Sequence, residues 1–553
     1  MTDTPVQDLA DSFLADMARL DPCAAARSSI AGSETELTDY APEGCDARAA
    51  LLRQTQAAHT DLTRDSGFAS DDERVTAALL SERIGSQLAQ YDAGDPLGRL
   101  GIINGPVAAV RSTFDNMPKA TAADLEVVAA RLAKVPAALA SIRAGVAAAI
   151  AGSSAPAVRQ VLATVEQCRT WAGAPGSGGW FASLAVHCAD LEPLAVAAGT
   201  AMGELGEWLS ATAAPSARTS DAAGPEVYGR AAAMMLGSVL DAREAYEWAW
   251  SELHQLEDQM RATIEQILPG GSLVETKAHL DQATAIAGAD AWRGWLQHLT
   301  DKTIGHMQGT YFDIDSAILE CQAMLPPAGG AAAPYYSPPS EDLRVPGRTW
   351  YPTLGRDRLP TWEMTTTVYH EAVPGHHLQL ARVKMLKDRL CRYRRNTLVS
   401  GHIEGWALYA ERLMDEIGAY DNDPGGRLGF LSFQALRAAR VVIDIGLHLG
   451  YPLPVSERPD EGRGSDSWTV ELAKKMLVER VGLSSAFASS EVDRYLGWPA
   501  QAIGYKLGER DWLAARAEAS ARLGEAFDLK VWHTTALDLG SLGLTQMRSE
   551  LAA

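Results

Sequence analysis

The sequence lacks an excess of basic residues. Lysine and arginine number 49 against 70 aspartates and glutamates, which gives a formal net charge of −21. Nucleic acids and anionic membranes repel so acidic a chain, and we expect neither as a partner. The sequence also lacks an uncharged apolar run long enough to cross a bilayer, and Met1–Pro5 lacks the features of a signal peptide. We therefore expect a cytoplasmic protein.

Paired cysteines are also missing. The six cysteines are scattered, and no two have the CxxC spacing of a zinc or redox pair. We therefore expect free thiols in a reducing compartment and no cysteine-ligated zinc. The six are Cys23, Cys45, Cys168, Cys188, Cys321 and Cys391.

The alternation of β-branched and polar residues that marks half-buried strands is rare. Most segments instead have the helical period of apolar residues and are rich in alanine, leucine, glutamate and arginine. We predict a mainly α fold, with Arg348–Tyr351 as the best strand candidate.

The length of 553 residues exceeds what one hydrophobic core holds, so we expect two lobes. Ser210–Pro225 is rich in alanine, serine, threonine and proline, as linkers are. We predict an N-terminal helical lobe over residues 1–215 and a lobe bearing the catalytic site over 225–553, packed as one continuous unit. Two loops are predicted at Leu325–Gly347 and Pro452–Asp466.

What the sequence does contain is a dense histidine motif, Tyr369–Gln379. It holds three of the twelve histidines, and the first of them, His370, is followed directly by Glu371. Neutral imidazoles hold zinc, and an adjacent carboxylate can take a proton from water at the metal. The motif therefore predicts a zinc site with His370 as a ligand and Glu371 as the general base.

The spacing of these histidines differs from the ordinary His-Glu-x-x-His pattern, in which the imidazoles share a helical face. His376 and His377 follow His370 by six and seven residues. On an ideal helix, His377 would return to the face of His370. A helix broken at Pro374 and Gly375, with two residues looped out, would return His376 instead. We expect such a break, and geometry alone leaves both histidines open as the second ligand.

A third ligand is expected from the helical segment Gly401–Glu411. Glu404 and Glu411 are seven residues apart and share a helical face. Glu404 is the candidate ligand, and Glu411 is a candidate acceptor that orients an imidazole. The simpler alternative, that both are solvated surface carboxylates, is the weaker one for Glu404 and equally good for Glu411.

Two further segments carry polar residues on otherwise apolar helices. Arg440, Asp444 and His448 form one stripe, and His448 could donate a hydrogen bond to a substrate carbonyl or oxyanion. Gln501 and Tyr505 share a face, and Tyr505 is our candidate for stabilising the oxyanion. The competing interpretations are a surface Arg–Asp pair and a core tyrosine with a satisfied hydroxyl.

Together these segments resemble the bacterial domain-of-unknown-function 885 family. The family patterns are His-Glu-Ala-x-Pro-Gly-His-His-x-Gln, Glu-Gly-Trp-Ala-Leu-Tyr-x-Glu, Arg-x-x-x-Asp-x-Gly-x-His and Gln-Ala-x-x-Tyr-x-x-Gly. They match residues 370–379, 404–411, 440–448 and 501–508. The segment Tyr335–Ser340 matches as well, and Phe527–Leu529 with His533 matches more weakly.

That family is distantly similar to the helical gluzincin zinc peptidases, namely carboxypeptidase Taq, thimet oligopeptidase and angiotensin-converting enzyme. The resemblance implies a two-lobed helical fold with a deep central channel and a small β element near the metal. In gluzincins a Gly-His pair supplies the second ligand, which implies Zn²⁺ held by His370, His376 and Glu404. The sequence departs from these patterns at Leu408, where some gluzincins have aspartate, and at Ala500, where the family usually has glycine.

We therefore expect a zinc metallopeptidase of the carboxypeptidase or oligopeptidase type, acting on a peptide or small amide. Glu371 would be the base, Tyr505 with His448 would stabilise the oxyanion, and Arg348–Tyr351 would pair with the peptide backbone. The alternatives are a zinc hydrolase of a non-peptide amide or ester and a non-catalytic, metal-stabilised binding protein. A di-iron protein is disfavoured because its Glu-x-x-His pairs are absent. Substrate specificity and oligomeric state do not follow from the sequence.

Overall fold

The computed structural model describes residues 4–64, 67–115, 117–186, 188–326, 333–458 and 466–552. Parts of the two predicted loops, 327–332 and 459–465, lie outside these ranges. The chain divides into two compact units. Unit 1 comprises Met1–Ala231, Leu447–Gly450 and Ser489–Pro499, and unit 2 comprises Ala232–Gly446, Tyr451–Ala488 and Ala500–Ala553.

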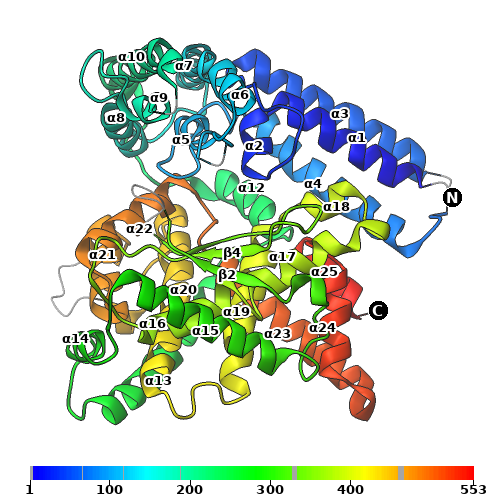
Figure 1. Cartoon of the computed structure of the whole chain (residues 1–553), viewed down its shortest axis with the longest axis vertical. Helices are drawn as coiled ribbons and strands as arrows, with labels where there is room; N and C mark the ends of the chain where they lie inside the picture. Colours follow the sequence, from blue (N-terminus) through cyan, green and yellow to red (C-terminus); the bar gives the residue numbers. More distant parts are fainter. Residues whose placement is uncertain are drawn as a thin grey trace. The chain divides into compact units, whose positions relative to one another are not determined.

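The named secondary-structure elements in the described part of unit 1's main segment are all helices (Figure 1). Its helices are α1 (Pro5–Leu20), α2 (Pro22–Arg27), α3 (Pro42–Thr63), α4 (Asp71–Asp92), α5 (Pro106–Ser112), α6 (Ala122–Leu132), α7 (Val135–Ala151), α8 (Val158–Ala172), α9 (Ala182–Ala185), α10 (Glu192–Trp208) and α11 (Ala214–Ser216). Proline occupies the first position of α1, α2, α3 and α5, where its missing N–H costs nothing and its fixed φ favours the helix.

The predicted linker Ser210–Pro225 differs from the structure in its first half. A π-helical turn, Leu209–Ala213, leads directly into α11, and unit 1 extends to Ala231. Leu209 and Ala213 are fully buried in the core of unit 1, so this segment packs as part of the helical unit.

Unit 2 carries most of the remaining helices. They are α12 (Gly224–Leu236), α13 (Ala242–Ile267), α14 (Leu273–Ala283), α15 (Ala289–Met307), α16 (Trp362–Glu371), α17 (His376–Met385), α18 (Arg392–Asn396), α19 (Ser400–Glu416), α20 (Pro424–Leu449), α21 (Val470–Val481), α22 (Ser485–Gly497), α23 (Gly504–Leu523), α24 (Leu529–Asp538) and α25 (Leu544–Ala552). Helices α12, α20 and α22 contribute residues to both units. The predicted mainly α fold is confirmed.

Two small sheets accompany the helices of unit 2. In the larger, β4 (Gly347–Trp350) lies between β2 (Cys321–Met324), which is parallel to it, and β3 (Tyr335–Ser337), which is antiparallel. The smaller pairs β1 (Ile286–Ala287) with β5 (Arg358–Leu359). Helix α15 packs against β2, and α17 packs against β3 and β4 (Figure 1).

The position of β4 confirms one prediction and corrects another. Arg348–Trp350 are in a strand, as predicted. Both edges of that strand are already paired, with Arg348 opposite Gln322 on one side and Ser337 on the other. The prediction that this segment pairs with a peptide substrate is therefore wrong, because a central strand has no unpaired backbone edge to offer.

Helices α19 and α23 approach each other closely because glycines meet at their crossing. A Cβ on Gly405 would lie 2.4 Å from the carbonyl carbon of Gly508, and a Cβ on Gly508 would lie 2.0 Å from the carbonyl oxygen of Gly401. Any larger residue at these positions would push the helices apart. This packing fixes the separation between the helix that carries Glu404 and the helix that carries Tyr505.

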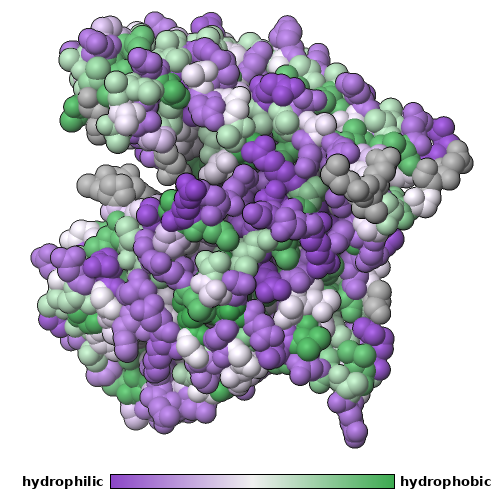
Figure 2. All heavy atoms as spheres, turned by 45° about the vertical axis from the view of Figure 1, so that its right-hand side comes forward, coloured by the Kyte–Doolittle hydropathy of each residue, from purple (hydrophilic) through white to green (hydrophobic). Residues whose placement is uncertain are grey.

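The visible surface mixes polar and apolar residues (Figure 2). On the face shown in Figure 2, polar residues are widespread and apolar residues are interspersed among them. Among the described residues, no helix has both the length and the hydropathy needed to span a membrane.

Candidate metal centre

The histidine motif breaks a helix, as predicted. Helix α16 ends at Glu371, and α17 begins at His376 after a turn that contains a cis Val373–Pro374 peptide bond. Gly375 is required in this turn, because a Cβ there would lie 1.9 Å from the carbonyl oxygen of His370. The buried indole of Trp406 donates to the carbonyls of Pro374 and Gly375 at 3.0 and 3.3 Å, which ties the turn to α19.

The break brings His370, His376 and Glu404 together. One ligand atom from each lies within 4.8 Å of the others, and the Glu404 Oε2 atom is 3.7 Å from His370 Nε2 and 3.5 Å from His376 Nε2. Two ligands of a tetrahedral zinc, each about 2.0–2.2 Å from it, lie about 3.3–3.6 Å apart. The 3.5 Å separation falls within this range, and the 3.7 Å separation lies just outside it. The donor set of two imidazole nitrogens and one carboxylate also suits zinc.

His377 faces away from this group. Its Nε2 lies 2.8 Å from the carbonyl oxygen of Ile318, to which it can only donate, and its Nδ1 then accepts from the Tyr336 hydroxyl at 2.9 Å. Burial lowers the pKa of His377 to about 4, so the ring is neutral. Both nitrogens are thus used within the protein, whereas His376 is the histidine placed beside His370 and Glu404.

Glu411 orients the first histidine. Its Oε1 accepts from His370 Nδ1 at 2.7 Å, so the Nε2 lone pair is left for the site. The carboxylate is 1% exposed, and it also lies 3.4 Å from Gln434 Nε2 and 3.9 Å from Arg437 Nη2. Burial opposes its ionisation, but Arg437 and His370 outweigh burial and lower the pKa of Glu411.

Glu371, the residue after the first histidine, is buried and lines the same cavity. Burial raises the pKa of its carboxyl group, with a further increase from Glu404, against the opposing influence of both histidines. A raised pKa brings a carboxylate nearer to neutral pH, where a general base works best. For Glu404 the balance is reversed, because the two histidines outweigh burial and hold its pKa well below the usual range.

The cavity beside these residues has a volume of about 430 Å³ and lies wholly within unit 2. Tyr505, Arg437 and Arg440 line it, together with the residues of the candidate centre, which are His370, Glu371, His376, Glu404 and Glu411. The Arg440 guanidinium lies 5.0 Å from the centre of the Tyr505 ring. Much of the remaining lining is apolar, including Met364, Leu380, Ile403, Phe433, Leu436 and Phe487.

The three residues of the predicted polar stripe on α20, Arg440, Asp444 and His448, have different surroundings. Arg440 lines the cavity, and Asp444 accepts from the backbone N–H of Ala500 at 3.0 Å. Ala500 has a φ of +63°, a conformation that favours glycine, so this hydrogen bond stabilises the turn that leads into α23 and Tyr505. Ala500 is also where the sequence departs from the family pattern.

His448 is not brought to the cavity. It belongs to unit 1, where Nδ1 accepts from the Ala223 N–H at 3.0 Å and Nε2 donates to the Tyr495 carbonyl at 3.0 Å. The ring also packs against Tyr228. Both ring nitrogens serve packing within unit 1, and the oxyanion role predicted for His448 has no geometric support.

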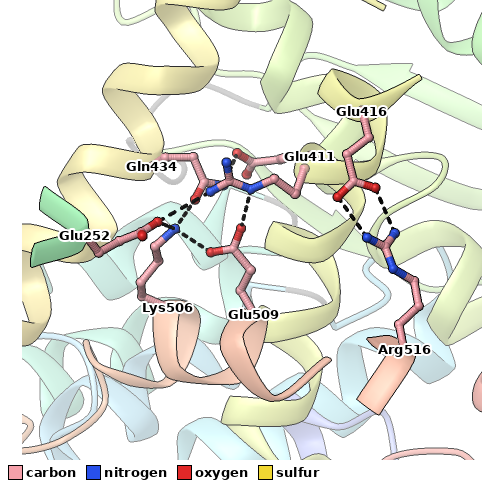
Figure 3. Close-up of polar contacts among 8 residues, drawn as sticks. Glu252, Glu411, Glu416, Gln434, Lys506, Glu509 and Arg516 are labelled. Carbon is pink, nitrogen blue, oxygen red and sulfur yellow. Dashed lines mark hydrogen bonds and ion pairs between the residues drawn. The ribbon is translucent and has the colours of Figure 1, made fainter. Parts of the chain in front are cut away.

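A buried polar network that was not predicted from the sequence lies behind Glu411 (Figure 3). Lys506 is 1% exposed and donates to Gln434 and Glu509, with Glu252 at 2.9 Å. Gln434 in turn donates to Glu411. The network joins α13, α19, α20 and α23 around the acceptor of His370. The only local signal was a lysine and a glutamate three residues apart next to Tyr505, which equally suits a surface pair.

These features define a mainly helical chain with an interior His-His-Glu centre. A family model described as "Bacterial protein of unknown function (DUF885)" matches residues 22–551, and the chain belongs to that family. No curated protein matches the chain.

Two solved structures share the fold. "The putative lipoprotein from Colwellia psychrerythraea" is 22% identical, with a TM-score of 0.83 over 100% of this chain and 99% of that one. "A putative lipoprotein of unknown function from Shewanella oneidensis" is 19% identical, with a TM-score of 0.72 over 99% of each chain.

Proposed function

We propose that this protein is a zinc-dependent hydrolase that cleaves peptide bonds. The observation that carries the proposal is the spacing of His370, His376 and Glu404, which fits tetrahedral zinc, next to a buried Glu371 with a raised pKa. A structural zinc site would be closed by a fourth protein ligand and would need no base. Here the three candidate ligands line a cavity, which leaves room for water and substrate.

The roles of the residues follow from their positions. Zn²⁺, when bound, would supply a Lewis acid that polarises the scissile carbonyl and activates water. Glu371 would accept a proton from the attacking water and deliver it to the amine nitrogen as the C–N bond breaks. Tyr505 would donate a hydrogen bond to the oxyanion from the cavity wall. Glu411 would hold His370 in the tautomer that presents Nε2.

The resemblance to the helical gluzincin peptidases, a deep central channel and a cytoplasmic location belong to the same proposal. The gluzincin resemblance is supported by the sequence pattern around the two histidines, the mainly helical fold and the small sheet in the unit that carries the site. The cytoplasmic location is supported by the scattered cysteines of the sequence.

The proposal is tested by separating metal binding from hydrolysis. Glu371→Gln should keep one zinc per chain but lose about 10²–10⁴-fold in peptide hydrolysis, because it removes the base and no ligand. Glu404→Ala should lose the zinc itself. Glu363→Gln, a substitution on α16 of a residue paired with Lys277, is the matched control and should change neither property.

Elemental analysis gives the zinc content, and mass spectrometry of a peptide library gives the hydrolysis. Stoichiometric zinc without cleavage of any peptide would refute the peptidase proposal. Full zinc content in Glu404→Ala would refute the ligand set.

A further inference from the structure

One wall of the cavity is a single face of helix α20. Phe433, Leu436, Arg437 and Arg440 all line the cavity, and their spacing of three, four and seven residues places them on one helical face. The wall therefore offers two guanidinium groups between apolar side chains, on the helix that also supports Glu411 through Gln434. None of the four is a candidate metal ligand, and Arg437 lies near the centre only through its 3.9 Å contact with Glu411.

The protein pairs only some of the hydrogen-bond donors of Arg437. Its side chain is 11% exposed, and its Nη2 lies 3.9 Å from Glu411 Oε1. Nε and Nη1 are buried and have no hydrogen-bond partner among the described residues. A guanidinium carries five N–H donors, and leaving a buried donor unpaired is costly. The Arg437 side chain lines the cavity, so an anionic group that enters the cavity would lie beside a guanidinium whose charge the protein balances only through Glu411 at 3.9 Å.

The charge of the lining points to an anionic partner. The charged groups around the cavity are the carboxylates of Glu371, Glu404 and Glu411 and the guanidinium groups of Arg437 and Arg440. With the two charges of zinc added, four positive charges face three negative ones, which leaves one positive charge. A bound carboxylate would neutralise it, and an arginine can hold a carboxylate through two parallel hydrogen bonds.

We propose that Arg437, assisted by Arg440, binds a carboxylate of the substrate, and that this carboxylate is the free C-terminus of a peptide. The inference rests on the proposed hydrolase function and deepens it, since a C-terminus held beside the metal centre restricts cleavage to bonds near the end of the chain. An acidic side chain has the same chemistry, and the experiment separates the two sources. Arg437 is thus a substrate-binding residue of the centre.

The first measurement is binding without turnover. Zinc-loaded Glu371→Gln protein is titrated by calorimetry with trialanine, with trialanine amide, and with an N-acetylated tripeptide amide that carries one glutamate. Trialanine should bind about 10- to 100-fold more tightly than its amide, as expected for hydrogen bonds to a charged group. Equal affinity for all three would overturn the proposal. Tight binding of the glutamate peptide alone would overturn the C-terminal assignment.

The second measurement separates Arg437 from the metal, which can itself attract a carboxylate. In Arg437→Met, the ratio of the affinities for trialanine and trialanine amide should fall close to one, while the zinc content stays at one per chain. Arg437→Lys should restore part of this preference for trialanine. Arg427→Met, on the same helix but paired with Asp415, is the matched control and should keep the full preference. A preference that survives in Arg437→Met would overturn the role of this residue.

Hydrolysis assays on the protein without substitutions distinguish a failure of the carboxylate site from a failure of the peptidase function. If trialanine binds preferentially but no peptide is cleaved, the carboxylate site stands and the peptidase function fails. If free and amidated peptides are cleaved with equal kcat/KM, the peptidase function stands and the carboxylate site fails. Because this comparison uses no Arg437 variant, it holds even where a variant fails to fold.

Discussion

Replacing Glu411 by glutamine should weaken zinc binding without removing a ligand. Glu411 is 1% exposed and accepts from His370 Nδ1 at 2.7 Å, so the contact is a buried hydrogen bond to a charged acceptor. Such bonds contribute about 1.5–3 kcal/mol, and the neutral amide that replaces the carboxylate retains about 0.5–1.5 kcal/mol. The difference of about 1–2 kcal/mol corresponds to a zinc Kd raised about 5- to 30-fold.

Zinc affinity is measured by titrating the metal-free protein in competition with a chromophoric chelator at pH 7.5. Glu416→Gln is the control, since Glu416 lies on the same helix and pairs with Arg516 at 2.8 Å (Figure 3). Its side chain is 38% exposed, so its loss should leave the zinc Kd unchanged and cost less than about 1 kcal/mol of stability. The reasoning is refuted if the two variants bind zinc equally well.

Two further predictions concern stability. Gly375→Ala should destabilise the fold by about 1–3 kcal/mol, because the new Cβ would lie 1.9 Å from the His370 carbonyl oxygen, whereas Gly294→Ala, with open space around its Cβ, should be neutral or stabilising. Equal urea midpoints for these two variants would contradict this account of the turn. Burial lowers the pKa of His533 from 6.5 to about 4, so the unfolded state binds the extra proton first as the pH falls. The resulting stabilisation of up to about 3 kcal/mol is complete above pH 6.5 and lost by about pH 4. His533→Gln should therefore show a smaller fall in unfolding free energy between pH 7 and 4.5, and a fall as steep as that of the unmodified protein would rule this out.

The local part of the centre could be read from the sequence. A proline cannot continue the hydrogen bonding of α16, and a glycine after it permits a tight turn, so a break at Pro374 and Gly375 follows from residue type alone. The spacing of Glu404 and Glu411 on one helix also follows from the helical period. Their different roles were predicted as well, but for Glu411 a solvated surface carboxylate was an equally good prediction, and only its buried contact with His370 Nδ1 decides between the two.

The long-range part could not be read in this way. Lys506, Gln434 and Glu252 lie on three helices that meet only after folding, and each alone resembles an ordinary surface residue. The close approach of α19 and α23 depends on Gly405 and Gly508, about a hundred positions apart, with no signal until the helices are in contact. The candidate ligands therefore lie close together in the sequence, whereas the residues that support them come from distant segments.

The histidines show how far a sequence pattern can predict a metal ligand. His370 donates from Nδ1 to Glu411, so its Nε2 remains available for a metal. His377 and His448 each form hydrogen bonds with both nitrogens within the protein. The decisive acceptors are the backbone carbonyls of Ile318 and Tyr495, which every residue type carries. A side-chain pattern cannot reveal a partner that is present at every position. A histidine in a motif is thus a candidate ligand only until the fold shows which of its nitrogens remains unused.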